Sequence, residues 1–174
     1  MNRRNIISTL AAGAAAAATV GVASAADKEI DVLVEHWKKS KDLTLKVAEA
    51  MPAENYDYKP FADARPFGGE LQHIGEAEGF YLGRLGKNGR APATPRGDTS
   101  KDTTIKYLTA NFDWAIGVVG QLTAADLTKT AGGRGPATTG LDLLYGAMIH
   151  TAHTRGYGEM YLRNKGVKPP DYDV

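Results

Sequence analysis

The sequence contains no cysteine, carries almost no net charge and has no long, strongly apolar run after its first 25 residues. The lack of cysteine excludes disulfide bonds, thiolate nucleophiles and metal sites built on cysteine ligands. A formal net charge of +1 gives no electrostatic reason to expect a nucleic-acid partner. With 43% hydrophobic and 24% charged residues in 174 positions, the composition indicates one globular domain and excludes collagen-like and disordered chains.

Residues 1–25 are typical of an export signal that is removed by cleavage. Arg3 and Arg4 form a positive start, an uncharged alanine-rich stretch follows, and Ala23-Ser24-Ala25 presents small residues for cleavage. A membrane anchor is the alternative, but this stretch is short and weakly apolar for a membrane span. We therefore expect a mature domain of residues 26–174 that is periplasmic or secreted and not held in a membrane. The arginine pair leaves both the Sec and the twin-arginine export routes open.

Four segments of the mature chain repeat apolar residues at three- and four-residue steps, which is the period of an amphipathic helix. These predicted helices span residues 27–50, 70–85, 101–122 and 141–164. Pro52 ends the first of them, and Gly166 followed by Pro169 and Pro170 ends the last. No segment alternates apolar and polar residues convincingly as a strand would. The sequence therefore predicts an all-α domain, most simply a four-helix bundle.

The connections between the predicted helices are long for a bundle. Residues 51–69 contain Tyr56, Tyr58 and Phe61, so we expect this connection to pack against the helices. Residues 86–97, rich in glycine, proline and arginine, predict an exposed loop, and residues 124–140 predict another connection rich in glycine and threonine. Connections of this length allow crossovers, so the helices need not alternate strictly up and down.

Histidine is rare in this chain and is its main chemical signal. The four histidines are His36, His73, His150 and His153. His150 and His153 lie three residues apart on the last predicted helix and therefore project from neighbouring positions. If that helix lies beside the one with His73, three imidazoles can meet, which is typical of a divalent metal site with an open position. The spacing alone favours structural histidines that are hydrogen-bonded to a neighbour. We interpret His36 as a partly exposed helix residue.

Three other side chains of the last predicted helix have both a structural and a functional interpretation. Tyr157 and Tyr161 face roughly as His150 does, and we favour core packing over the lining of a pocket. Arg155 could hold an anionic substrate, but an ion pair with Glu159, four residues on, is the favoured interpretation. Each of these interpretations can be compared with the tertiary structure.

Three stretches of the chain carry a resemblance to a known family: Met51–Pro60, Phe67–Glu78 and His150–Pro170. In order and spacing they resemble the first connection, the second helix and the last helix of the DinB-like superfamily of helical-bundle metalloproteins. The resemblance spans nearly the whole mature chain. It implies a four-helix bundle in which His73 and His150 are ligands of one divalent metal ion.

The last helix departs from the family's pattern at one position. In the family, the second histidine often lies four residues after the first, directly before Arg-Gly, where this chain has Thr154. His153 would be the substitute, although a helix turns by about 100° per residue. Glu76, three residues after His73, is a candidate extra ligand or an acceptor that orients the imidazole. Two outcomes stay open: a site formed by His73, His150 and His153, or a site that has two histidines, is weakened or is lost.

The resemblance also implies a function. Relatives include metal-dependent hydrolases and transferases that use small thiols, in which zinc, nickel or iron lowers the pKa of a bound water or thiol. We therefore expect an exported enzyme of one of these types that acts on a small molecule, and the resemblance further implies a homodimer. The alternative is a non-catalytic bundle that binds a partner or a small ligand and has a degenerate metal site.

Overall fold

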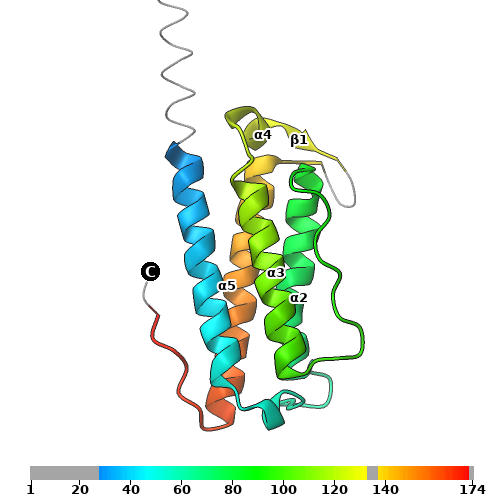
Figure 1. Cartoon of the computed structure of the whole chain (residues 1–174), viewed down its shortest axis with the longest axis vertical. Helices are drawn as coiled ribbons and strands as arrows, with labels where there is room; N and C mark the ends of the chain where they lie inside the picture. Colours follow the sequence, from blue (N-terminus) through cyan, green and yellow to red (C-terminus); the bar gives the residue numbers. More distant parts are fainter. Residues whose placement is uncertain (1–27, 133–136, 173–174) are drawn as a thin grey trace, which may run out of the picture.

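A bundle of four long helices forms the body of the protein, as the described residues show (Figure 1). The computed structural model describes residues 28–132 and 137–172. The long helices are the first helix (residues 28–50), α2 (Phe67–Leu82), α3 (Lys101–Val119) and α5 (Gly140–Asn164). The predicted all-α bundle is thereby confirmed. Within the described ranges, no helix combines the length and the apolar character that a membrane crossing requires.

Short elements occupy the connections between the long helices. They are the 3-10 turns η1 (Ala53–Asn55) and η2 (Gly83–Leu85), the helix α4 (Ala124–Thr128) and the strands β1 (Thr130–Ala131) and β2 (Thr138–Thr139). The two strands pair antiparallel, so the expectation of no strands was wrong at this point. A ladder of two residues per strand is too short to leave an alternating pattern in the sequence.

The predicted bounds of three helices differ from the observed ones by up to three residues, the smallest difference being at α5, which begins one residue early at Gly140. Helix α2 begins at Phe67, three residues before the predicted start, and its final turn tightens into η2. The sequence did not indicate this earlier start, because Gly68 is a poor helix former. A side chain is excluded there, because a Cβ on Gly68 would lie 2.0 Å from the carbonyl oxygen of Thr99. Helix α3 ends at Val119, three residues before the predicted end.

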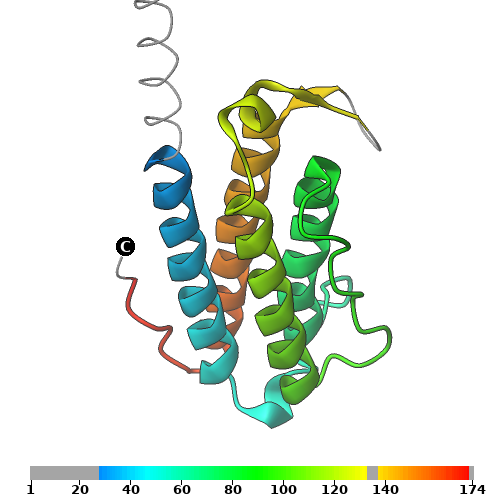
Figure 2. The ribbon, with the colours of Figure 1, turned by 45° about the horizontal axis from the view of Figure 1, so that its top comes forward.

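The helices do not alternate in direction, because α2 and α3 run parallel. Gln72 donates to Thr104 over 2.9 Å, and two turns later Asn111 donates to Glu78, so residue numbers rise together along both helices. The connection between these helices therefore runs back along the length of the bundle (Figures 1 and 2). Such a crossover is what the long connections allowed.

Helices α2 and α5 run antiparallel and lie side by side. Gly158 of α5 packs against Leu71 near the start of α2, whereas Gly146 packs against Tyr81 near its end. Residue numbers therefore fall along α5 as they rise along α2. This neighbourhood is the condition under which the sequence predicted that His73 would meet the histidines of the last helix.

The first connection packs against the bundle as predicted, with one exception. Tyr56 is fully buried, donates a hydrogen bond to the carbonyl oxygen of Ala48 over 2.7 Å and lies edge-on to Phe67. Tyr58 is half-buried beside the ring of Tyr161. Phe61 is the exception, because 67% of its surface is exposed. The exposed ring lies at the edge of a pocket described below.

A close approach between α2 and α3 makes Gly75 a sensitive position. A Cβ on Gly75 would lie 2.6 Å from the Tyr107 hydroxyl, whose oxygen is within hydrogen-bonding distance of Thr94. We expect Gly75→Ala to lower the free energy of unfolding by about 1–3 kcal/mol through overpacking, measured by urea denaturation. Gly83→Ala is the matched control, since nothing lies within 4 Å of its added Cβ. Equal effects of the two substitutions would contradict this account of the contact.

Candidate functional site

His73 of α2 and His150 of α5 lie next to each other at the surface between these helices. Their ring centroids are 4.9 Å apart and the rings meet edge to face. Both side chains are half-buried. They line a shallow hollow of about 340 Å³ together with Glu76, Ala77, Phe80 and Tyr81. The structure thus brings together two of the three predicted ligands.

Each of these imidazoles has a polar neighbour at the same ring nitrogen. The Nδ1 atom of His73 lies 3.1 Å from a carboxylate oxygen of Glu76, and Nδ1 of His150 lies 3.4 Å from the Thr154 hydroxyl. When Nδ1 carries the proton and donates to such a neighbour, Nε2 presents its lone pair to a ligand. Glu76 is thereby placed as the acceptor that orients His73.

The electrostatic surroundings favour the metal-binding form of His150. Burial lowers the pKa of His150 below its usual value, and the neighbouring imidazoles of His73 and His153 lower it further. A lowered pKa keeps the ring neutral at pH 7, and only the neutral imidazole can donate a lone pair to a metal ion.

His153 does not share the arrangement of the other two histidines. It is exposed and its ring packs edge-on against Tyr157, at a centroid distance of 4.7 Å. Thr154 instead occupies the buried position beside His150, as the turn of the helix between successive residues dictates. Among the described residues, no set of three or more histidine, aspartate or glutamate side chains is arranged to hold a metal ion together. The third histidine ligand therefore stays a prediction, and His36 is exposed on the first helix.

Arg155 does not form the expected ion pair with Glu159. Its buried guanidinium lies 3.3 Å from the Ser40 hydroxyl of the first helix and 5.6 Å from the centre of the Tyr172 ring. Glu159 pairs instead with Arg163, at 3.7 Å. Position 155 of α5 faces the neighbouring first helix. Arg155 therefore contacts both the first helix and the C-terminal segment.

The two tyrosines of α5 divide between the two interpretations of the sequence. Tyr161 is buried and contacts the core rings of Phe67 and Tyr58. Tyr157 is 49% exposed and lines a pocket, as the less favoured interpretation held. The two tyrosines lie four residues apart on α5, and both side chains line the same pocket, which is described below.

A buried carboxyl group, Glu78, was not singled out by sequence reasoning. Its side chain is completely buried and accepts hydrogen bonds from Asn111 of α3 and Thr151 of α5. Burial raises the pKa of Glu78 to about 8, although both hydrogen bonds oppose this rise. The signal was its position within the apolar side of α2, where a charged residue is unusual.

Comparisons with known proteins place the fold. A model of the DinB superfamily matches residues 36–157. A crystal structure of a DinB-like protein from Bacillus cereus is 19% identical, with 81% of this chain and 95% of that chain covered and a TM-score of 0.69. A DinB-like protein from Bacillus subtilis is 22% identical, with 81% and 97% covered and a TM-score of 0.66. At these identities the two structures demonstrate a shared fold. No curated protein matches the sequence.

Proposed function

The chain belongs to the DinB superfamily, and we propose that it is a metal-binding member in which His73 and His150 hold one divalent ion. The observation that carries the proposal is the pairing of these two half-buried imidazoles from neighbouring antiparallel helices. The ring of each has a polar partner at Nδ1, which suits coordination through Nε2.

The donor set fits a borderline metal ion with open coordination positions. Two neutral imidazoles suit zinc, nickel or iron, and His153 or solvent would supply further ligands. When bound, such an ion acts as a Lewis acid that lowers the pKa of a water or thiol. The chain's own part is to orient His73 through Glu76, to keep His150 neutral and to offer a hollow open to substrate. Hydrolysis and thiol transfer are the reaction types that this chemistry would serve.

Metal content tests the proposal directly. Residues 26–174, purified without a histidine tag or chelator and incubated with zinc, nickel or iron salts, are expected to hold about one ion per chain by elemental analysis. His73→Ala and His150→Ala should each abolish that stoichiometric binding and the thermal stabilisation by metal, because a ligand bound only to the folded state stabilises it. His36→Ala, at an exposed position of the first helix, is the control. An unchanged metal content in the two site variants would defeat the assignment.

A second candidate function is a non-catalytic bundle with a degenerate metal site. The specific observation in its favour is Thr154, which occupies the buried place beside His150 while His153 lies exposed. Under this alternative, wild-type protein binds none of the three metals, and the histidine variants change neither metal content nor thermal stability.

Export and dimerisation belong to the same proposal. Residues 1–25 lie outside the described residues, so cleavage after Ala25 stays a prediction. A homodimer is supported by exposed apolar side chains on the outer face of α5, where Tyr145 is 52% and Ile149 67% exposed. We propose a periplasmic or secreted protein that acts on a small molecule.

A further inference from the structure

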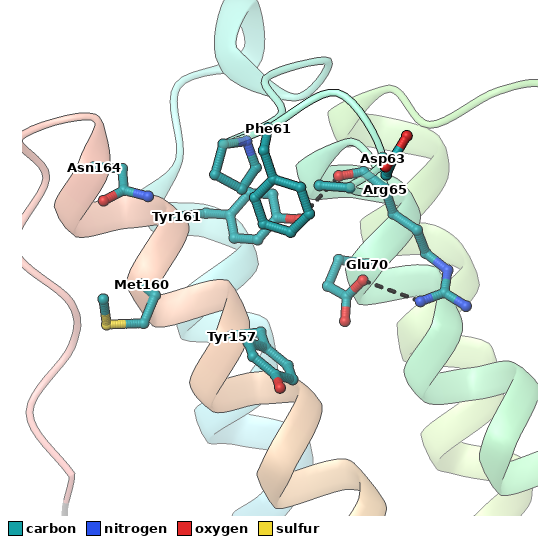
Figure 3. Close-up of a pocket in the computed structure, with 10 residues that line it drawn as sticks. Phe61, Asp63, Arg65, Glu70, Tyr157, Met160, Tyr161 and Asn164 are labelled. Carbon is teal, nitrogen blue, oxygen red and sulfur yellow. Dashed lines mark hydrogen bonds and ion pairs between the residues drawn. The ribbon is translucent and has the colours of Figure 1, made fainter.

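A second and larger pocket lies between the first connection and the end of α5. It encloses about 710 Å³ and contains neither His73 nor His150. One wall is the segment around residues 60–65 and the opposite wall is α5, with α2 between them (Figure 3). The side chains that matter for its chemistry are Phe61, Arg65, Glu70, Tyr157, Met160 and Tyr161.

A carboxylate with little solvent contact lies inside this pocket. The Glu70 side chain is only 11% exposed, and one of its oxygens pairs with Nη1 of Arg65 at 3.3 Å. The other oxygen is directed away from Arg65 in Figure 3. The Arg65 side chain is 52% exposed, so the partner of this buried carboxylate is itself in contact with solvent. The carboxylate is therefore able to accept a hydrogen bond from a ligand that enters the pocket.

Aromatic and apolar side chains surround this carboxylate. Phe61, Tyr157 and Met160 are 67%, 49% and 52% exposed, which leaves apolar surface that a ligand would cover. Tyr161 of α5 fixes the position of the segment around residues 60–65, because its hydroxyl donates to the backbone oxygen of Arg65 over 2.9 Å. Aromatic rings beside a carboxylate provide both parts of a site for a cation: a charged acceptor and electron-rich ring faces.

The charge of the lining also favours a cation over an anion. Asp63 and Glu70 are acidic, whereas Arg65 is the one basic residue of the lining and is already paired with Glu70. An anion could bind only the remaining N–H groups of Arg65, and the carboxylates of Asp63 and Glu70 in the same lining would repel it. A cation can replace Arg65 at Glu70, and the guanidinium is then free to turn into solvent.

We propose that this pocket binds an organic amine with an apolar body. The protonated amine donates to the Glu70 carboxylate, and the apolar body covers Phe61, Tyr157 and Met160. This site goes beyond the proposed metal centre, since its residues are separate and it needs no metal ion.

Isothermal titration of the metal-free mature protein tests the proposal with two probes of similar size and opposite charge. The probes are 2-phenylethylamine and 3-phenylpropanoate. We expect one amine to bind per chain, with at least about tenfold weaker affinity in Glu70→Gln, because a hydrogen bond to a charged group is lost. Arg65→Gln should bind the amine as tightly as wild type or more tightly. Glu159→Gln, which removes one carboxylate of α5 outside the lining, should leave the affinity unchanged.

Three results would overturn the proposal. One is the absence of amine binding to wild type at millimolar concentration, and another is equal amine affinity in wild type and Glu70→Gln. The third is preferential binding of 3-phenylpropanoate that Arg65→Gln abolishes, which would make the pocket an anion site. Tyr157→Ala, expected to weaken amine binding several-fold, supplies an independent test should Glu70→Gln fold poorly. Because no metal is present, failure here is distinguishable from failure of the metal site.

Discussion

Raising the pH from 5 to 8 is expected to destabilise the wild-type protein by about 3–4 kcal/mol relative to Glu78→Gln. Burial raises the pKa of Glu78 to about 8 in the folded protein, from its ordinary value of 4.5. Between these values the folded carboxyl keeps its proton, whereas the unfolded one loses it. Each unit of rising pH therefore favours unfolding by about 1.4 kcal/mol, and the stabilising contribution present below pH 4.5 is lost as the pH approaches 8.

Urea denaturation of both proteins at several pH values would measure this difference. Glutamine resembles the protonated carboxyl group in shape and retains an oxygen that can accept from Asn111, but it does not titrate. Glu54→Gln is the control, because this carboxylate of η1 is exposed and lies outside the core. A difference between wild type and Glu78→Gln that does not change between pH 5 and 8 would show that Glu78 has an ordinary pKa.

The second large effect concerns the position where this chain departs from its family. Thr154→His is expected to increase the affinity for zinc or nickel by at least about tenfold, because it adds a third imidazole beside His150. The Thr154 hydroxyl already lies 3.4 Å from Nδ1 of His150, so a longer side chain at this position reaches the region of the histidine pair. Competition with a metal-binding dye would measure the affinity of each variant.

Ala152→His is the matched control for that substitution. It adds a histidine to the same helix at an exposed position, on a different side from residue 154. We expect this control to leave the metal affinity at the wild-type value. Because Thr154 is buried, thermal unfolding without metal would show whether the larger side chain is accommodated. A well-folded Thr154→His protein with wild-type affinity would mean that position 154 does not face the site.

Glu78 and the histidine pair share structural supports, so the two predictions bear on one region. Thr151, which donates to Glu78 inside the bundle, directly precedes Ala152 and follows His150 on α5. The same turn of α5 therefore holds a buried hydrogen bond on its inner side and a half-buried imidazole at the surface. We expect a substitution that displaces Glu78 to move both Thr151, on the inner side of this turn, and His150, at its surface.

Much of the fold could be predicted from the sequence because helices are local. The apolar period of 3.6 residues located all four long helices, and Pro52 and Gly166 correctly marked where two of them end. The spacing of the histidines and the resembling motifs also identified His73 and His150, which do lie together. These features depend on residues close in sequence or on a motif that keeps its order along the chain.

What the tertiary structure decided depends on contacts between distant segments. The parallel course of α2 and α3, the direction of Arg155 toward Ser40 and the burial of Glu78 all follow from how the helices pack against one another. No local pattern specifies the rotation of one helix against its neighbours, and that rotation buried Thr154 and left His153 exposed. The sequence by itself determined the helices and the candidate ligands. Packing determined which side chains meet, because proximity across the bundle is set by the whole core.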